Sequence, residues 1–293
     1  MPRSIRGCGN DAGDLLRHSH HAGSHAAAAE ACGRRGHCAD AARSIRPAAR
    51  PHDPLAQNVL ARLQGPTTAH WLGTDQFGRD ILSRVLYGMR ASLGIAATSV
   101  FAALVAGGSL GLAAAYYRGW TDRIVMRLMD VLFAFPLMLL AIGIIAMLGP
   151  GARPTAISIA IVYTPIFARL LRGPALVIVT SDYVMSARSI GASDARIIFS
   201  HILPNLASVI LVQLSLLLSS AILVEASLSF LGLGTQPPTP SLGMMLSEGR
   251  NMLLLSPWAA IFSGAAILAI AFALNLLGDV LRDTLDPRLR GQR

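Results

Sequence analysis

The sequence predicts an all-α protein that crosses a membrane several times. Of its 293 residues, 53% are hydrophobic and only 14% are charged, and the apolar residues gather in long runs instead of recurring at the period of a soluble core. A helix needs roughly 20 apolar residues to cross the hydrocarbon core of a bilayer. We therefore expect a polytopic helical bundle with five spans, the third of them marginal in length, at residues 93–117, 128–148, 156–171, 206–231 and 258–281.

Residues 1–50 differ in composition from the rest of the chain. They hold all three cysteines, five of the eight histidines and eight arginines, and they lack an apolar run of spanning length. We expect this segment to be poorly ordered. The spacing of Cys32, His37 and Cys38 fits no standard zinc pattern, so no metal site is predicted. The segment also lacks the continuous apolar region of a signal peptide.

Residues 51–92 are expected to form an extracytoplasmic segment that ends in an interfacial helix. Asp75 and Arg79, and likewise Asp80 and Arg84, are spaced i,i+4 with the acid first, which is the favourable order on a helix. An apolar stripe beside them indicates an amphipathic helix at the membrane surface. The residues that define this segment are Gly73, Thr74, Asp75, Gly78, Arg79, Asp80 and Arg84.

Residues 93–293 are expected to form the transmembrane domain. Glycine, alanine and serine are frequent in its spans, for example at residues 106–109 and at Gly111. Small residues allow two helix backbones to approach closely within a membrane. Pro136 and Pro165 are expected to kink their helices.

Arginines predict the orientation, because the chain contains no lysine and its formal charge is +9. Basic residues beside apolar spans mark the cytoplasmic side of a membrane protein. Two of the loops hold only Arg153 and Arg250. The C-terminus and the loop at residues 183–204 are therefore expected in the cytoplasm, and no nucleic-acid partner is expected. The eleven arginines of the predicted inner side are Arg118, Arg123, Arg127, Arg169, Arg172, Arg188, Arg196, Arg282, Arg288, Arg290 and Arg293.

The loop at residues 183–204 is too polar to span a bilayer, although apolar runs flank it on both sides. Its pattern predicts a short helix that ends at Gly191 as C-cap and a second short helix that begins after Ser193 as N-cap. Pro204 is expected to end the second helix. One interpretation is an ordinary amphipathic loop between two membrane helices. The other is a rigid element that meets a cytoplasmic partner.

The second interpretation is favoured by a resemblance. The loop resembles the EAA loop of bacterial ABC-importer permeases, in which a Glu-Ala-Ala triplet is followed at fixed spacing by Gly and by Leu-Pro. The triplet positions here are residues 185–187, without the Glu and the first Ala, and the later positions are Gly191, Leu203 and Pro204. The string GTDQFGRDILSRVLYGMRASL at residues 73–93 is similar to the segment before the second membrane helix in permeases of the dipeptide, oligopeptide and nickel systems, of the C-subunit type.

The resemblance implies a permease subunit of an ATP-driven importer. It implies a second, homologous permease as heterodimer partner, two ATP-binding cassette subunits, a substrate-binding protein outside, and a bacterial inner membrane. ATP and Mg²⁺ would be used by the partner subunits, and no cofactor would bind this chain. The residues implied in ATPase coupling are Tyr183, Met185, Ser186, Ala187, Arg188, Gly191, Ala192, Ser193, Asp194, His201, Leu203 and Pro204.

The family has six membrane helices, whereas five are predicted here. The additional helix of the family precedes the segment that begins here near Pro51. Our hypothesis is that a different start site or reading frame accounts for the composition of residues 1–50.

Glu225 is the single residue of the spans most expected to carry a function. A carboxylate at membrane depth is costly unless it faces the bundle interior, a cavity or a partner. The sequence favours equally a structural hydrogen bond between helices and a role in gating.

The chain is not expected to be an enzyme. A P-loop requires a lysine, which the sequence lacks, and there is also no HExxH motif and no GxSxG in a strand-to-helix setting. The expected function is translocation of dipeptides or oligopeptides, with nickel or another small solute as the alternative. An ion-coupled carrier is a further alternative, but it would need paired ionisable groups and internal repeats.

Overall fold

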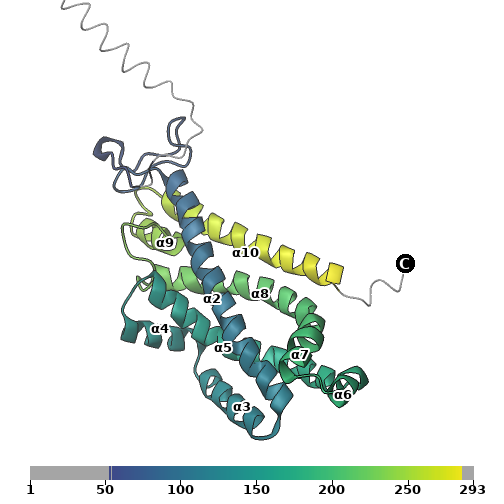
Figure 1. Cartoon of the computed structure of the whole chain (residues 1–293). Helices are drawn as coiled ribbons and strands as arrows, with labels where there is room; N and C mark the ends of the chain where they lie inside the picture. Colours follow the sequence, from purple (N-terminus) through teal and green to yellow (C-terminus); the bar gives the residue numbers. More distant parts are fainter. Residues whose placement is uncertain (1–52, 54, 286–293) are drawn as a thin grey trace, which may run out of the picture. The chain divides into compact units, whose positions relative to one another are not determined.

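The computed structural model describes residue 53 and residues 55–285. The expectations for residues 1–50 lie outside this part of the chain. The described residues are α-helical and contain no β-strand, which confirms the all-α class (Figure 1). The elements are η1 (Val59–Ala61), α2 (Ile81–Tyr117), α3 (Gly119–Phe133), α4 (Leu137–Leu148), α5 (Ala152–Val179), α6 (Asp182–Ser189), α7 (Asp194–Ile197), the π-helical turn η2 (Ile198–Ile202), α8 (Leu203–Phe230), α9 (Leu242–Asn251) and α10 (Trp258–Leu285).

Four helical stretches within the described residues are long and apolar enough to cross a membrane. They are α2, α5, the continuous stretch Asp194–Phe230, and α10 up to Thr284. The bent pair α3 and α4 makes a fifth if it counts as one span. The third predicted apolar run, residues 156–171, is marginal in length. In the structure, residues on both sides of this run are also helical, so α5 has 28 residues and is about 42 Å long.

The predicted second span at 128–148 is not one straight helix. α3 ends at Phe133, α4 begins at Leu137, and the two axes differ by 90°. Pro136 is the N-cap of α4 with an extended backbone. A proline has no N–H to donate and disfavours helical geometry at the residue before it, so the helix stops and restarts here. The expected kink at Pro136 is thus a complete break. Pro165, in contrast, lies inside the single helix α5.

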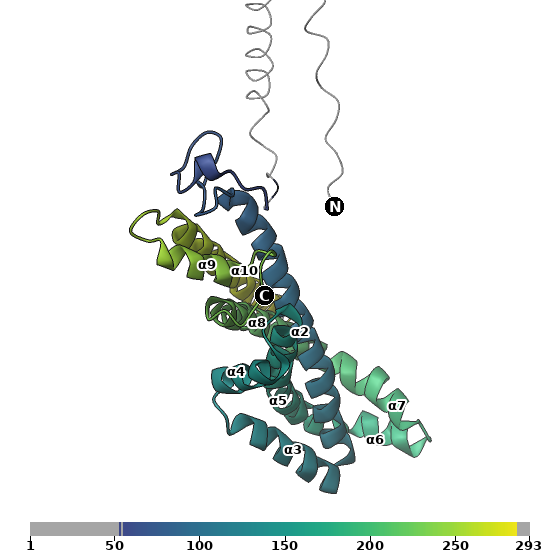
Figure 2. The same ribbon diagram turned by 90° about the vertical axis from the view of Figure 1, so that its left-hand side faces the viewer.

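α2 and α5 pack closely against each other (Figures 1 and 2). A Cβ atom at Gly107 would lie 2.2 Å from the Thr164 carbonyl oxygen, and one at Gly111 would lie 2.3 Å from the Ala168 carbonyl oxygen. These distances leave no room for a side chain. The expected close approach of backbones at the small residues 106–111 is therefore confirmed, and α5 is the partner helix.

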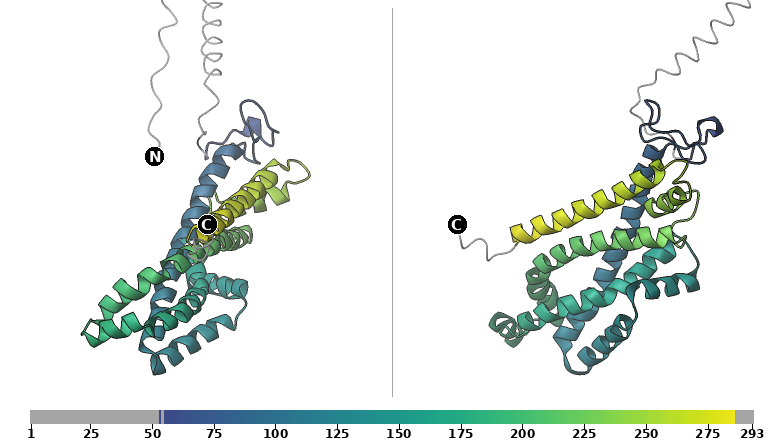
Figure 3. Two further views of the ribbon diagram at one scale, coloured as in Figure 1. Left: turned by 90° about the vertical axis from the view of Figure 1, so that its right-hand side faces the viewer. Right: turned by 180° about the vertical axis from the view of Figure 1, so that it is seen from behind.

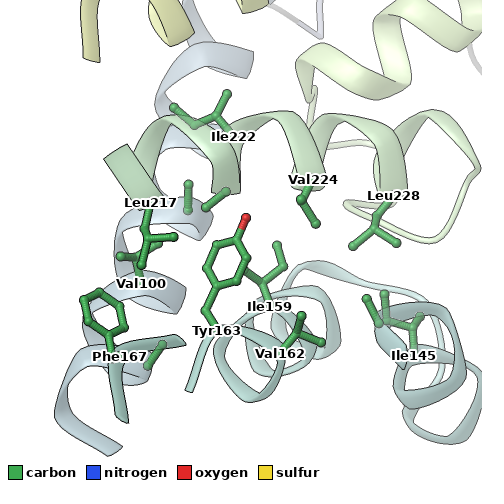
Figure 4. Packing of buried hydrophobic residues seen from close by; sticks show 14 residues of the cluster. Val100, Ile145, Ile159, Val162, Tyr163, Phe167, Leu217, Ile222, Val224 and Leu228 are labelled. Carbon is green, nitrogen blue, oxygen red and sulfur yellow. The ribbon is translucent and has the colours of Figure 1, made fainter. Parts of the chain in front are cut away.

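The largest apolar core lies where α2, α4, α5 and α8 meet. Tyr163 and Phe167 of α5 are buried in the same cluster as Ile222 of α8 and Val100 of α2 (Figure 4). The four helices are fixed to one another by this core. Residues 55–80 and α9 lie at one end of α2, and α6 and α7 lie towards the other end (Figures 2 and 3).

We predict that Gly111→Ala destabilises the protein. The new methyl group would collide with the backbone of α5, and such overpacking costs about 1–3 kcal/mol. The matched control is Gly94→Ala in the same helix, where an added Cβ meets no atom within 4 Å. Thermal unfolding in detergent should show a lower Tm for Gly111→Ala only. Equal Tm values for the two variants would contradict the close packing of α2 and α5.

Candidate functional site

The candidate coupling element comprises α6, the turn at Gly191, α7 and η2. The Ala192 N–H donates to the Ala187 carbonyl (3.1 Å) and the Gly191 N–H donates to the Arg188 carbonyl (3.0 Å). This pair of bonds is a Schellman motif, which places Gly191 in the left-handed region at φ +83°. The predicted glycine C-cap is confirmed. Ser193 is the N-cap residue of α7, although its side chain makes no capping hydrogen bond.

The expected end of the second short helix at Pro204 is wrong. The chain continues from α7 through η2 directly into α8, and the Leu203 N–H donates to the Ile198 carbonyl. Pro204 directly follows this π-helical turn and is the second residue of α8. The coupling element is therefore joined to α8 by unbroken helix. Its join to α5 is a two-residue link, Thr180 and Ser181.

The inner side of the coupling element is anchored by apolar packing. Val184 of α6 and Ile197 of α7 are buried against the ends of three spanning helices. Their buried neighbours are Ala115 and Tyr116 of α2, Ala175 and Val179 of α5, Ile202 of η2, and Leu206 of α8. Because these contacts are close-packed, a displacement of the element displaces the helix ends with it.

A polar contact adds to this anchor. The Tyr116 hydroxyl donates to the Asp194 carboxylate at 2.6 Å, and the Arg188 guanidinium lies 5.0 Å from the centre of the Tyr116 ring. One side chain of α2 therefore contacts both α6 and α7. The sequence analysis missed Tyr116. Its position at the end of a span, next to a second tyrosine, was the available signal.

The outer side of the element is exposed and partly apolar. Ile190 is 86% exposed and Phe199 is 68% exposed, and Met185 is also exposed. At the triplet positions, Met185 and Ser186 face outward and Ala187 is buried. Exposed apolar groups beside the Arg188 and Arg196 side chains form a surface suited to a protein partner.

The remaining predicted coupling residues lie around the start of α8. His201 and Leu203 are half-buried and Pro204 is exposed. The ring centres of Tyr183 and His201 are 6.3 Å apart, and the Asn205 amide donates to the Tyr183 hydroxyl (3.1 Å) and to the His201 carbonyl (2.6 Å). These contacts connect α6 to η2 and α8. Asp194, although exposed, is held by Tyr116.

The segment at residues 73–84 does not form the expected helix throughout. α2 begins at Ile81 with Asp80 as its N-cap, and residues 73–80 form a buried turn. Asp80 accepts from the Ser83 N–H (2.9 Å) and hydroxyl (2.7 Å). The expected Asp80–Arg84 ion pair is wrong, because an N-cap carboxylate turns towards the free N–H groups of the helix. The Asp75–Arg79 pair exists, with 2.7 Å between its atoms, but in a turn.

Asp75 is the centre of a charge cluster at the α9 end of the bundle, which also contains Arg79, Arg84 and Glu248. Arg84 is 2.5 Å from Asp75 and 2.9 Å from Glu248 of α9. Arg79 is 2.7 Å from Asp75 and 3.5 Å from Glu248. The cluster therefore attaches α9 to the turn before α2. Glu248 was missed by the sequence analysis, because a lone acid in a loop gives no spacing signal.

The other residues of this signature shape the buried turn. Thr74 is fully buried, and its hydroxyl donates to the Ala61 carbonyl at 2.5 Å. A Cβ atom at Gly78 would lie 1.8 Å from the Asn58 carbonyl oxygen, so only glycine fits. A Cβ atom at Gly73 would lie 2.5 Å from the Gln64 carbonyl oxygen. The segment is a compact cap on the end of α2.

Glu225 lies on α8 and is fully buried. The Ser229 hydroxyl, one turn later, donates to one carboxyl oxygen at 2.7 Å, whereas the other carboxyl oxygen and the buried Ser92 hydroxyl of α2 have no hydrogen-bond partner within the described residues. The position suits both a structural link between α2 and α8 and a gating role, so its role stays a prediction. Within the described residues, no group of three or more His, Cys, Asp or Glu side chains could hold a metal ion.

A multi-pass helical bundle with a rigid two-helix element between two spans is the architecture of a membrane transport subunit. Residues 103–291 match the family of binding-protein-dependent transport system inner membrane components. The chain belongs to this family and is a multi-pass inner-membrane transport component. This confirms the family expected from the EAA-like loop.

The names of two relatives refer to the transport of peptides. The chain is 51% identical over 227 residues to the glutathione transport system permease protein GsiD of Pectobacterium atrosepticum, which covers 78% of this chain and 75% of that protein. It is 46% identical over 233 residues to the dipeptide transport system permease protein DppC of Alkalihalophilus pseudofirmus, which covers 80% of this chain and 77% of that protein.

Solved structures share the fold at low identity. The MetNI methionine ABC transporter in an inward-facing conformation aligns with a TM-score of 0.58 and 15% identity, covering 69% of this chain and 97% of that chain. An amino acid ABC transporter aligns with a TM-score of 0.54 and 16% identity, covering 70% of this chain and 95% of that chain. The helical architecture is therefore shared with ABC transporters.

We predict that Tyr116→Phe loosens the coupling element. The variant removes a hydrogen bond to a carboxylate at the surface, which is worth about 1–1.5 kcal/mol. Amide hydrogen exchange of residues 182–202 should become roughly five- to tenfold faster. The matched control is Tyr117→Phe, because the Tyr117 side chain is exposed and makes no hydrogen bond in the described structure. Equal exchange in the two variants would show that Tyr116 does not anchor the element.

Proposed function

We propose that this chain is one of two permease subunits of an ATP-driven importer of short peptides. The observation that carries the proposal is the coupling element, whose outer side is exposed and apolar and whose inner side is packed onto the ends of α2, α5 and α8. A partner that seats on Ile190 and Phe199 would move these helix ends directly. The fold and the family support a role in transport, and the identity of the partners is part of the proposal.

The partners are those that the family resemblance implies, and the exposed apolar and basic surface of the coupling element is compatible with one of them. Two ATP-binding cassette subunits would dock on the cytoplasmic side, one on this chain and one on a homologous permease, and they would use ATP and Mg²⁺. The orientation is supported by the arginine distribution, because the coupling element and the C-terminal end carry far more arginines than the loops that contain Arg153 and Arg250. A substrate-binding protein would approach α9 and residues 55–80 from the outer side.

The mechanism is a change between two packed arrangements of the helices. Closure of the ATPases would push α7, and α8 would follow as a rigid rod because η2 continues it without a break. α5 would follow through the short link at Thr180 and Ser181. Close packing makes such movements switch between discrete states, so the pathway would open alternately to the two sides.

Peptides are the substrates best supported by the relatives named for glutathione and dipeptides. Nickel or another small solute remains the alternative. An ion-coupled carrier is less well supported, because Glu225 has two serines rather than a second ionisable group as its polar neighbours. Such a carrier needs ionisable partners at membrane depth.

Reconstitution tests the substrate and the energy source. The complex purified with its neighbouring gene products should import a radiolabelled dipeptide or glutathione into proteoliposomes only with ATP, and nickel should neither be imported nor compete. Import of nickel in place of peptides would favour the alternative substrate. Peptide uptake that is driven by a proton or sodium gradient without an ATPase would contradict the importer.

We predict that Gly191→Trp uncouples ATP hydrolysis from transport. Gly191 faces open space at φ +83°, so the indole would protrude at the docking surface and also strain the turn. The assembled complex should hydrolyse ATP but import at least tenfold less peptide, a loss of about 1.4 kcal/mol of coupling.

The matched control is Gly149→Trp. Gly149 also faces open space, at φ +87°, but lies between α4 and α5. Its ψ of 161° makes a side chain there no less strained than at Gly191, and it lies outside the coupling element. Transport by Gly191→Trp equal to that of the control would contradict a coupling role for this turn.

A further inference from the structure

A charged groove lies between α3 and α5, apart from the coupling element. It is open, has a volume of about 710 Å³, and is formed where α3 packs against the second half of α5. Figure 2 shows α3 beside this part of the bundle. The charged side chains that line it are Asp122, Arg123, Arg127, Asp130, Arg169 and Arg172.

Two of the four arginines are neutralised across the groove. Arg172 donates to both carboxylate oxygens of Asp122, at 2.5 and 2.7 Å. Arg169 is 2.5 Å from Asp130 and its guanidinium lies 4.2 Å from the centre of the Phe133 ring. These pairs fix α3 to α5. They also leave the groove with two positive charges in excess.

The excess charge lies on Arg123 and Arg127, which are adjacent on successive turns of α3 and exposed. Arg123 stacks on Trp120, with 5.1 Å between the guanidinium and the ring centre. Within residues 55–285, neither arginine has an ion-pair or hydrogen-bond partner. Two adjacent guanidinium groups are suited to bind an anion with several oxygen atoms, since each presents a planar fork of donors.

An apolar stripe runs along α3 next to these arginines. Trp120, Ile124, Leu128 and Val131 recur at helical spacing and are 53–73% exposed. No other element of the described chain covers them. Within this chain, a cationic groove and an uncovered apolar stripe therefore border the same helix. This is the complement of a molecule with an anionic head and a hydrocarbon chain.

The groove has the composition of the headgroup layer of the membrane. Charged side chains are costly at the bilayer centre, whereas arginine and tryptophan are favourable at the interface. α5, at about 42 Å, is about 12 Å longer than the ~30 Å hydrocarbon core, so the helix extends beyond that core by about two turns in total. Arg169 and Arg172 lie in the C-terminal half of α5, where the apolar run of residues 156–171 ends. Lipid is thus the molecule that meets the groove at this depth.

We propose that the groove between α3 and α5 binds the headgroup of an anionic phospholipid. Arg123 and Arg127 hold the phosphate, and the acyl chains lie along the stripe from Trp120 to Val131. The pairs Arg172–Asp122 and Arg169–Asp130 hold the walls of the site and are not ligands. An anionic lipid is favoured over a zwitterionic one because two positive charges in the site have no counter-charge.

Lipid retention tests the proposal. The full chain, in its complex, is purified from an equal mixture of phosphatidylglycerol and phosphatidylcholine, and the retained lipids are quantified by mass spectrometry. The wild type should retain phosphatidylglycerol about tenfold more than phosphatidylcholine. The double variant Arg123→Gln, Arg127→Gln should lose this preference while it remains assembled.

The control is the double variant Arg90→Gln, Arg153→Gln, which also removes two positive charges, but from exposed positions outside the groove. It should keep the preference of the wild type. The proposal is overturned if the groove variant retains as much phosphatidylglycerol as the control, or if excess inorganic phosphate displaces the lipid, because the site would then take a free anion. It is also overturned if photo-crosslinkers at Ile124 and Leu128 capture the second permease instead of lipid.

Discussion

The structure depends on the burial of Val184 and Ile197 against the ends of α2, α5 and α8. α6, with eight residues, would be unstable alone, because isolated helices of this length do not persist in water, and α7 extends the helix of α8 beyond its apolar part. Packing onto the spans stabilises them and makes them part of the same rigid body. The contact that folds the coupling element is thus also the contact through which a force on it would reach the membrane helices.

The two ends of the bundle use different physical chemistry. The end with the coupling element is held by apolar packing and by the hydrogen bonds from Tyr116 and Asn205, and it leaves Ile190 and Phe199 uncovered. The end with α9 is held by the charge cluster around Asp75. Removing one partner of a buried ion pair is energetically costly, so this cluster holds α9 in its position against the start of α2. Between the two ends, α2 is held by the close approach of Gly107 and Gly111 to α5.

The sequence predicted the elements whose signals are local. Apolar runs predicted the spans, and Gly191 predicted the turn because a left-handed residue at a helix end favours glycine. Pro136 was recognised as a disruption, but its consequence, a 90° bend, depends on what α3 and α4 pack against. Pro204 was misinterpreted as a helix end, because the sequence does not show the π-helical turn that carries the chain past it.

Contacts between distant segments could not be predicted from spacing. The i,i+4 rule paired Arg84 with Asp80. In the structure, Arg84 lies instead between Asp75 and Glu248, and Glu248 is 164 positions further along the chain. Asp80 was unavailable because it caps α2. Tyr116 and Asp194 are likewise brought together only by the fold. The family resemblance suggested the coupling role that we propose for the loop, and the structure supplied the residues that hold it.

Accessibility of a single cysteine tests the central claim most directly. In a variant with Cys8, Cys32 and Cys38 replaced by serine, Ile190→Cys and Leu254→Cys place thiols at two exposed positions on the coupling element and next to α9. In intact cells, a membrane-impermeant maleimide should label Leu254→Cys only. In inverted vesicles it should label Ile190→Cys, and the assembled ATPases should block that labelling. Labelling of Ile190→Cys from outside, or its full labelling in the presence of the ATPases, would contradict a cytoplasmic coupling element.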